Sequence, residues 1–349
     1  MKIFLLAIGA RDRASSRLRI WDHVDWLRGQ DKSVRADSLV PLGAKVISIQ
    51  LVARIIARVP RWIAAFLWAD AIVLQEVLLL SPLLLIKNLG KDRRVVFDFS
   101  DPVDRHGSGW KGYIRRAAFE LIVRRADIVM VENRSYLDLL RGRARTCMHF
   151  YGPVDATRYG GTRAALLPRR HDAPVRIGWT GSPGTYRFIA PLMPVIDVIA
   201  RDHPIEVMLI GVAAIDYDFR HATLRLVAWD ETTEFATVPT FDLGLFRLDD
   251  SEDALWRGAG KLFIYMAAGV PFLANDRGIA RDLMAEAGVG FRVAGGADWE
   301  TVLRNAVANR DARDRMATAS LDRAAMLSYE AYRATLMAAL AAPGRRNAT

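Results

Sequence analysis

The stretch VRIGWTGSPGTYR, residues 175–187, decides the fold class, because a short apolar run passes directly through a glycine turn into a helical start. Residues 175–179 have the length and the β-branched and aromatic content of a strand buried on both faces. Gly181 allows the backbone to approach a ligand at the turn, and Ser182 and Thr185 offer hydroxyl groups there. The Gly-Lys-Ser/Thr ending of a P-loop is missing, so a simple strand-to-helix turn is the other interpretation.

Similar apolar runs alternate with helical patterns along the whole chain. The expected strands are residues 3–8, 71–75, 95–99 and 128–131 in the first half, and 175–179, 206–210, 224–228, 243–246 and 271–274 in the second. This alternation predicts parallel βαβ units and therefore an α/β protein.

The length of 349 residues exceeds what one ordinary core accommodates, so we expect two domains. Residues 1–155 and 174–325 would each form a Rossmann-like, doubly wound sheet. Residues 156–173 lack apolar periodicity and would connect the two domains, and residues 326–349 would form a last helix and a polar tail. Two such sheets facing each other place a cleft outside the carboxyl ends of their strands, where function is expected.

The excess positive charge lies entirely in the first half. Residues 1–155 carry 26 Lys and Arg against 16 Asp and Glu, whereas residues 156–349 carry 23 of each. Such asymmetry indicates an anionic partner, either a membrane surface, a phosphorylated lipid or a nucleic acid. Nucleic acid is the weakest of the three, because no recognised binding motif accompanies the charge.

Two helical patterns in this half combine basic residues with tryptophan. They are KVISIQLVARIIARVPRW (residues 45–62), in which Pro60 is expected to end a helix, and WKGYIRRAAFELIVRRAD (residues 110–127). Cationic amphipathic helices of this kind can lie in a bilayer interface. The other interpretation is a pair of helices packed on the sheet with solvated basic faces.

Two further turns are candidates for binding an anion. In GARDRASSRLR (residues 9–19), Gly9 permits a turn after a strand, Ser15 or Ser16 can cap a helix, and Arg17 follows in its first turn. In WRGAGKLFIYMAAG (residues 256–269), Arg257 and Lys261 are four residues apart and share one face if the segment is helical. An anion between these two cations would relieve their repulsion, so this second signal is the stronger one.

The stretch FDFSDPVDRH, residues 97–106, places several acidic residues at the end of an expected strand. Asp98 and Phe99 would point to opposite faces of the sheet, so one of them is expected to serve packing. A carboxylate here could act as a base or bind a substrate hydroxyl. Turn formation at Asp101–Pro102 is the alternative explanation.

The sequence also excludes several classes of site. Cys147 is the sole cysteine, so no internal disulfide can form, and the six histidines show no spacing typical of a metal site. Neither a dinucleotide-binding Gly-x-Gly-x-x-Gly nor a hydrolase Gly-x-Ser-x-Gly is present. No apolar run is long enough to span a membrane and the first residues lack a secretory pattern, which favours the cytoplasm.

Taken together, these stretches resemble the GT-B glycosyltransferases, especially those of family 4. The resembling segments are ASSRLR (14–19), ADAIVLQEV (69–77), VVFDFSDPVD (95–104), ADIVMVENRSYLDLL (126–140), YGPVDATRY (151–159), RIGWTGSPGTY (176–186), FDLGLFRLDD (241–250) and RGAGKLFIYMAAGVPFLANDRG (257–278). The last segment is the most specific, because in such enzymes this helix start binds the diphosphate of the donor.

The resemblance implies a GT-B fold whose last helix crosses back to the first domain. It also implies a hexosyltransferase that takes a sugar from a nucleotide-sugar, retains its configuration and needs neither metal ion nor cofactor. The residues assigned on this basis are Asp98, Asp101, Arg257 and Lys261 for catalysis, Gly181, Ser182, Thr185, Gly260 and Lys261 for the donor, and Gly9, Ser16 and Arg17 for the acceptor-side loop.

Two features depart from the family pattern. Many family 4 members carry a pair of glutamates where this chain has Trp256 and Ile264, and many carry a histidine near the position of Ser100. Two alternatives therefore stay open: a catalytically silent protein that binds a nucleotide-sugar or docks another transferase, and an epimerase of nucleotide-sugars. The expected acceptor is an envelope glycan, a glycolipid or a metabolite, and the protein could lie on the inner face of the membrane.

Overall fold

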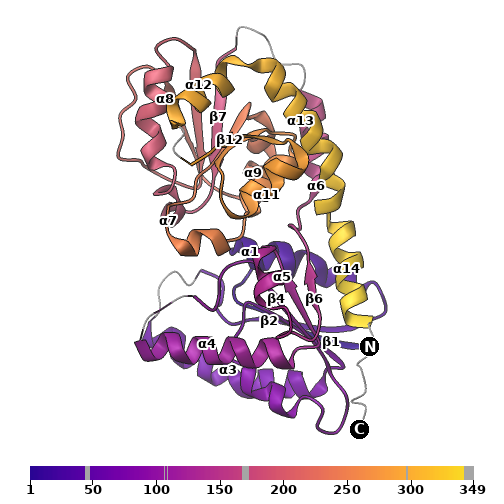
Figure 1. The fold of residues 1–349 in the computed structure, drawn as a ribbon. Coiled ribbons are helices and arrows are strands. Elements are labelled where there is room, and N and C mark those ends of the chain that lie inside the picture. The colour runs from indigo at the N-terminus through magenta and orange to yellow at the C-terminus, as the bar shows by residue number, and fades with distance from the viewer. Residues whose placement is uncertain (44–47, 106, 108, 167–172, 296–297, 342–349) are drawn as a thin grey trace. The chain divides into compact units, whose positions relative to one another are not determined.

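The computed structural model describes residues 1–43, 48–105, 107, 109–166, 173–295 and 298–341. The chain divides into two compact units, each built on a six-stranded parallel sheet (Figure 1). Unit 1 comprises Met1–Pro153, Trp256–Gly258 and Tyr332–Thr349, and unit 2 comprises Val154–Leu255 and Ala259–Ala331. The expected α/β class with two doubly wound sheets is confirmed.

The sheet of unit 1 has the order β2-β1-β3-β4-β5-β6. Its strands are β1 (Lys2–Ala7), β2 (Ser33–Ser38), β3 (Ala71–Gln75), β4 (Arg94–Phe99), β5 (Ile128–Val131) and β6 (Cys147–His149). The direction of winding reverses between β1 and β3. In open α/β sheets, ligands bind outside the carboxyl ends of the strands at such a reversal.

Helices cover both faces of this sheet. They are α1 (Ala14–Arg19), η1 (Trp21–His23), α2 (Val24–Arg28), α3 (Ile49–Trp68), η2 (Ser81–Ile86), α4 (Gly109–Arg125), α5 (Ser135–Leu139) and, from Tyr332 onward, α14 (Tyr329–Ala341). One face is covered by α3, η2 and α4, which share a core with Phe97 and Phe99 of β4. Because side chains alternate along a strand, Asp98 between them points to the opposite face.

The helix α3 continues through Pro60, so the expectation that this proline ends a helix is wrong. The helix begins with Ser48, whose side chain accepts a hydrogen bond from Leu51 N at 3.1 Å. Pro60 lies at the exposed surface, whereas Trp62 and Phe66 beyond it are fully buried. Packing of these two aromatic side chains offsets the main-chain hydrogen bond that the proline removes.

The sheet of unit 2 has the order β12-β11-β10-β7-β8-β9. Its strands are β7 (Val175–Thr180), β8 (Ile205–Ile210), β9 (Thr223–Val227), β10 (Leu243–Phe246), β11 (Phe272–Asn275) and β12 (Gly290–Val293). Counted within the unit, this is the order 3-2-1-4-5-6 of dinucleotide-binding Rossmann folds, and its winding reverses between β7 and β10. The carboxyl ends of β7 and β10 are therefore where a ligand is expected.

The helices of unit 2 are α6 (Ala156–Leu166), α7 (Pro183–Tyr186), η3 (Ala190–Leu192), α8 (Met193–Ile199), α9 (Glu231–Thr237), η4 (Val238–Thr240), η5 (Glu252–Trp256), α10 (Gly260–Ala267), α11 (Gly278–Ala287), α12 (Trp299–Ala308), α13 (Arg310–Ala324) and η6 (Ala325–Leu327). One face of the sheet shares a core with α8 and α12. On the other face α10 packs so closely on Gly244 that Tyr265 leaves no space for a Cβ there.

The expected connection between the domains is structured over its first part. Residues 156–166 form α6, which packs against α10, although their sequence shows no apolar periodicity. Residues 167–172 of that connection and the tail at 342–349 lie outside the described residues. Within the part of the chain that the structure describes, no helix is long and apolar enough to cross a bilayer.

Candidate functional site

The expected acceptor-side loop lies at the winding reversal of unit 1. The hydroxyl of Ser16 donates to Oε1 of Gln75 at 2.9 Å and accepts a hydrogen bond from Gly9 N at 3.0 Å. Ser16 and Arg17 of α1 are both buried. Ser16 therefore joins the turn after β1 to the end of β3, so the structure assigns its hydroxyl a positioning task within this turn.

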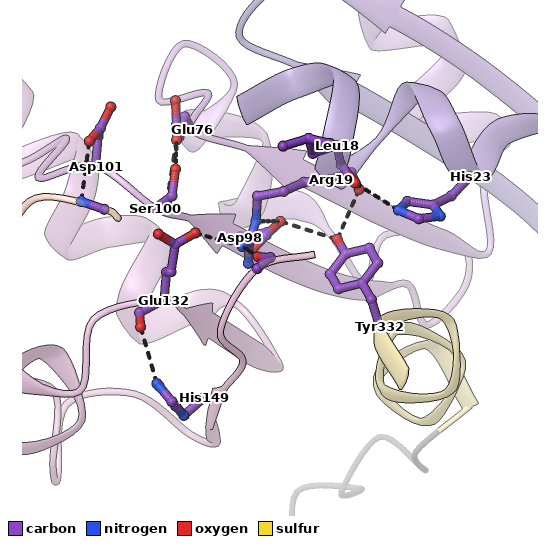
Figure 2. A network of polar contacts seen from close by, with 12 residues as sticks. Leu18, Arg19, His23, Glu76, Asp98, Ser100, Asp101, Glu132, His149 and Tyr332 are labelled. Carbon is purple, nitrogen blue, oxygen red and sulfur yellow. Dashed lines mark hydrogen bonds and ion pairs between the residues drawn. The ribbon is translucent and has the colours of Figure 1, made fainter. Parts of the chain in front are cut away.

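Arg19, at the end of α1, is the centre of a buried ion cluster (Figure 2). Its Nε and Nη2 donate to the two carboxylate oxygens of Asp98 at 2.8 and 2.5 Å. Its Nη1 donates to Oε2 of Glu132 at 3.2 Å and to the carbonyl of Gly152. None of the three charged side chains is more than 5% exposed. Burial disfavours the charge on Arg19, but the carboxylates outweigh it and raise its pKa above the ordinary value.

Tyr332 of α14 completes this cluster on one side. Its hydroxyl donates to the carbonyl of Arg19 at 2.9 Å and lies 3.4 Å from Oδ2 of Asp98. Burial raises the pKa of Tyr332, and the charge of Asp98 raises it further, so the phenol keeps its proton. His23 packs on the Tyr332 ring and its Nε2–H donates to the carbonyl of Leu18 at 2.7 Å. Burial lowers the pKa of His23 to about 3, so this ring is neutral near pH 7.

The predicted catalytic residue Asp98 is therefore fully enclosed. Its side chain has no exposed surface, and both of its carboxylate oxygens are bound by Arg19. A carboxylate in this state is suited to holding the strand end in place. In this enclosed position the carboxylate of Asp98 contacts Arg19 and Tyr332.

Glu76 is a carboxylate that the sequence analysis did not single out. It follows β3 directly, is buried, and has a φ of 57°, in the left-handed region that a non-glycine residue rarely occupies. Its Oε1 accepts hydrogen bonds from Ser100 N at 3.3 Å and Ser100 Oγ at 2.7 Å, and its Oε2 lies 3.7 Å from Nη2 of Arg13. Such outliers of backbone conformation cluster at functional sites.

The pKa of Glu76 is raised above its ordinary value. Burial is the largest cause and the negative charge of Asp101 the second, whereas Arg13 and Ser100 act in the opposite direction. Glu76 directly follows β3 and Asp101 lies two residues after β4, and both are labelled in Figure 2. A pair of carboxyl groups that repel each other at a strand end can bind a hydroxyl group or exchange a proton with it.

Asp101 is half-buried, and its Oδ1 accepts a hydrogen bond from Gly258 N at 3.4 Å. Gly258 belongs to the short segment Trp256–Gly258 that forms part of unit 1. Within this segment the Trp256 ring packs on Tyr136 with centroids 4.9 Å apart, and the guanidinium of Arg105 lies 4.0 Å from its centroid. Asp101 thus lies where this segment meets the end of β4.

The backbone at Arg257 is held by unit 1. Its carbonyl accepts a hydrogen bond from Nδ2 of Asn133 at 3.5 Å. The helix α10 begins at Gly260, so Arg257 is not helical. The expected helical face shared by Arg257 and Lys261 is therefore absent, because the Gly-Ala-Gly that separates them delays the helix start.

In unit 2, Lys261 lies against the turn after β7. A Cβ added at Gly181 would be 2.7 Å from Cε of Lys261 and 2.5 Å from the ring of Trp179. The Nζ of Lys261 is 5.4 Å from the centroid of that ring. The fold thus brings together Gly181 and Lys261, two predicted donor-binding residues that are far apart in the sequence.

The end of β8 presses on the same turn. Gly211 has a φ of 93°, and a Cβ there would lie 2.0 Å from the carbonyl oxygen of Gly181. Gly181 N donates to the carbonyl of Ile210 at 3.0 Å. Only glycine satisfies both the backbone angle and the close approach at residue 211. The turn at Gly181 is therefore held from two sides.

The start of α10 and the turn at Gly181 leave polar groups at the surface. Ala259 is the N-cap residue of α10 and makes no side-chain hydrogen bond to the helix. Gly260 is exposed, with no atom within 4 Å of its Cβ position. Ser182 is also exposed, and Thr185 Oγ1 donates to its carbonyl at 3.0 Å. A helix start without a side-chain cap, beside a lysine, suits a phosphate group.

A second carboxylate not singled out from the sequence lies beneath this turn. Glu234 of α9 is buried and its Oε1 accepts a hydrogen bond from Oγ1 of Thr180, the last residue of β7, at 2.8 Å. It is placed to hold the end of the strand. Within the described residues, no group of three His, Cys, Asp or Glu side chains could hold a metal ion.

Solved structures of low sequence identity share this architecture. Sucrose-phosphate synthase from Thermosynechococcus elongatus matches with a TM-score of 0.69 and 11% identity over 97% of each chain. WaaG, a glycosyltransferase involved in lipopolysaccharide biosynthesis, matches with a TM-score of 0.68 and 12% identity over 98% of this chain and 100% of its own. HepE from Anabaena, in complex with UDP and glucose, matches with a TM-score of 0.64 and 15% identity over 98% of this chain and 99% of its own.

These similarities show that the chain has the GT-B glycosyltransferase fold, as its sequence predicts. Neither the protein-family models nor the curated proteins compared with the sequence give a match.

Proposed function

We propose that this protein is a glycosyltransferase that moves a sugar from a nucleotide-sugar to the hydroxyl group of an acceptor. The observation that carries the proposal is the contact of Lys261 with Gly181 at the winding reversal of unit 2, beside the start of α10. The similar structure of HepE holds UDP and glucose, which supports a nucleotide-sugar as the ligand. By its resemblance to family 4, the transfer would retain the sugar's configuration and need no metal ion.

The donor would bind to unit 2 through its diphosphate. The Lys261 ammonium and the main-chain N–H groups at the start of α10 would neutralise the charge that develops on the departing diphosphate. The hydroxyl groups of Ser182 and Thr185 and the open space beside Gly260 would accommodate the phosphates. Arg257 stays in the proposal as a second cation for the diphosphate.

The acceptor would bind to unit 1. Asp101, half-buried at the end of β4, would contact the acceptor hydroxyl or the reacting sugar, and Glu76 beside it would share this task. The cluster of Arg19 and Asp98 would hold the strand ends in place. The turn at Gly9 would form the edge of the acceptor side.

A catalytically silent binder of nucleotide-sugars is the second candidate. Trp256 and Ile264 stand where many family members have glutamates, and both are packing side chains that offer no carboxylate. Trp256 packs edge to face on Tyr136, and Ile264 is buried in α10. A protein that binds the donor but cannot activate it would have such a site.

The variant Lys261→Met tests the proposal, because methionine keeps the apolar contact with Trp179 and Gly181 and removes the charge. Thermal unfolding with UDP, GDP, ADP and their sugar conjugates identifies the donor, and sugar release or transfer from that donor measures turnover. Removing one hydrogen-bond donor that stabilises a transition state lowers turnover about 100- to 1,000-fold. We expect such a loss in Lys261→Met with an unchanged melting temperature.

The exposed Arg225 of β9 provides the matched control, and Arg225→Gln should change neither binding nor turnover. Full turnover in Lys261→Met would contradict the assignment. Nucleotide-dependent stabilisation of the wild type without any sugar release or transfer would identify a silent binder. Conversion of the donor to an isomer in the absence of acceptor would identify an epimerase.

A further inference from the structure

One helical layer of unit 1 has an apolar outer surface. This layer, here called the α3–η2–α4 layer, consists of α3, η2 with its flanking residues 78–90, and α4, and its inner side packs on the sheet (Figure 1). Seventeen large hydrophobic side chains are exposed among the described residues, and eleven lie on this layer. They are Ile49, Val52, Ile56, Leu67, Leu79, Leu85, Ile86, Leu89, Trp110, Tyr113 and Ile114.

The helix α3 is apolar on two sides. Its inner side buries Trp62 and Phe66, as is normal for a helix on a sheet. On its outer side Ile49, Val52 and Ile56 follow one another at intervals of three and four residues, and Ile56 is 64% exposed. A helix at the surface of a water-soluble domain ordinarily presents charged and polar residues on that side. The outer side of α3 therefore has the apolar composition of a surface that contacts a binding partner.

The first turns of α4 add aromatic side chains to the same surface. Trp110 and Tyr113 are each 69% exposed, and Ile114 is 56% exposed. The Nζ of Lys111 lies 5.7 Å from the centroid of the Trp110 ring. Tryptophan and tyrosine combine an apolar body with a polar edge, which suits the boundary between lipid headgroups and acyl chains.

The layer is also strongly basic. The helix α3 contains Arg54, Arg58 and Arg61 and no acidic residue, and α4 contains five basic residues and one acid. That acid, Glu120, is paired with Arg124 at 2.6 Å and with Arg143. Exposed apolar side chains interspersed with basic residues that outnumber the acidic ones fit an anionic lipid surface and fit poorly to a purely apolar protein partner.

A cavity beside α3 has the same electrostatic character. It measures about 330 Å³, and its lining includes Arg28, Arg35 and Arg61 together with the ring of Trp62. Asp37 at the same cavity is already engaged by Arg58 and by Nε1 of Trp62, the latter at 2.8 Å. The positive charge around α3 thus extends from the helix to the neighbouring edge of the sheet.

We propose that the α3–η2–α4 layer binds an anionic bilayer surface. The apolar side chains of α3 and of the first turns of α4 enter the boundary between headgroups and acyl chains, and the arginines and Lys111 contact lipid phosphates. This inference concerns a surface and not the reaction, so it stands or falls independently of the proposed sugar transfer.

Flotation of the full-length protein with vesicles tests the proposal. Vesicles of phosphatidylcholine alone and of phosphatidylcholine mixed with phosphatidylglycerol separate apolar from electrostatic binding. We expect binding to the mixed vesicles that weakens with added salt. A basic residue near an anionic surface contributes about fivefold in affinity, so Arg54→Gln/Arg61→Gln should bind about 30-fold more weakly.

The variant Ile56→Ser/Trp110→Ser should bind at least about tenfold more weakly, because it removes two side chains that enter the bilayer. The matched controls lie in unit 2 and are Leu224→Ser/Met326→Ser and Arg225→Gln/Arg315→Gln, which should bind like the wild type. Stabilisation by the nucleotide identified for the wild type should be the same in all four variants, which separates this test from that of the reaction.

Three results would overturn the inference. The first is a wild type that does not bind the mixed vesicles, and the second is an equal loss of binding in the control variants. The third is self-association in sedimentation velocity that Ile56→Ser/Trp110→Ser abolishes, because the layer would then be covered by a second copy of the chain.

Discussion

The variant Arg19→Met probes the buried cluster that holds the candidate site of unit 1. In the wild type this guanidinium neutralises Asp98 and Glu132 and donates to the carbonyl of Gly152. Methionine has a similar length but leaves two buried carboxylates facing each other without a cation. Removing one partner of a buried ion pair costs about 3–5 kcal/mol, a large part of the roughly 5–15 kcal/mol that stabilises a domain.

Urea unfolding followed by circular dichroism measures this loss. We expect the free energy of unfolding to fall by about 3–5 kcal/mol near neutral pH. Arg19→Lys keeps the charge but loses the guanidinium that binds both oxygens of Asp98. Its free energy of unfolding should therefore lie between those of the wild type and Arg19→Met.

Arg13→Met is the matched control, because this arginine lies six residues earlier, is about half exposed, and stands 3.7 Å from Glu76. Its loss should cost about 1 kcal/mol or less, as for other partly exposed ion pairs. A loss below about 1 kcal/mol in Arg19→Met would refute the view that this cluster holds the strand ends together.

Two further variants test the turns at the candidate sites. The folded-state pKa of Glu76 is raised above its ordinary value of 4.5, so its stabilising contribution is present at low pH and lost as pH rises. The melting temperature of Glu76→Gln should therefore exceed that of the wild type above about pH 6 and should not exceed it below about pH 4. A difference in melting temperature that stays constant over this pH range would contradict a raised pKa of Glu76. Gly211→Ala should cost about 2 kcal/mol or more in chemical unfolding, because its φ is 93° and its Cβ would meet the carbonyl of Gly181. Gly260→Ala, where a Cβ meets open space, is its control and should cost nothing.

Apolar runs predicted every inner strand of both sheets and the edge strand β9, and missed the other three edge strands. All nine predicted strands are present, with ends that agree to within one residue. The three missed strands are β2, β6 and β12, and each is the outermost strand of its sheet. The sequence of β2, SVRADS, alternates exposed and half-buried positions for most of its length. A strand with a neighbour on one side needs no continuous apolar run, so this criterion finds an edge strand such as β9 only where its sequence is apolar.

The donor-side turn was more predictable than the carboxylates. Gly181 and Lys261 stand out because a glycine after a strand and a lysine at a helix start are local signals. Their contact could not be predicted locally, because it depends on the strand order that places β7 beside β10. The position of Arg257 was misjudged for a local reason, since the helix starts three residues later than its pattern suggests.

Alternation along β4 correctly indicated that Asp98 and Phe99 point to opposite faces, but both side chains are buried. Asp98 is enclosed by Arg19 and Tyr332, which come from opposite ends of the chain, and no pattern near residue 98 reports them. Glu76 was passed over because its left-handed backbone conformation leaves no trace in the sequence. The available clue was an acidic residue directly after a strand that is apolar up to its last residue, Gln75.

The membership of Tyr332 in unit 1 has a consequence for biosynthesis. Its ring packs against Phe150 and His23, and its hydroxyl reaches Arg19, yet the ribosome adds it after every residue of unit 2. Nascent domains generally fold in order from the amino terminus. Here unit 1 cannot complete its fold until α14 has been synthesised, and until then Arg19 and Asp98 are exposed to water. Unit 2, which lies within unit 1 in the sequence, can form its whole sheet before that. A nascent chain stalled before residue 332 should therefore expose unit 1 to proteases and chaperones while unit 2 is already protected.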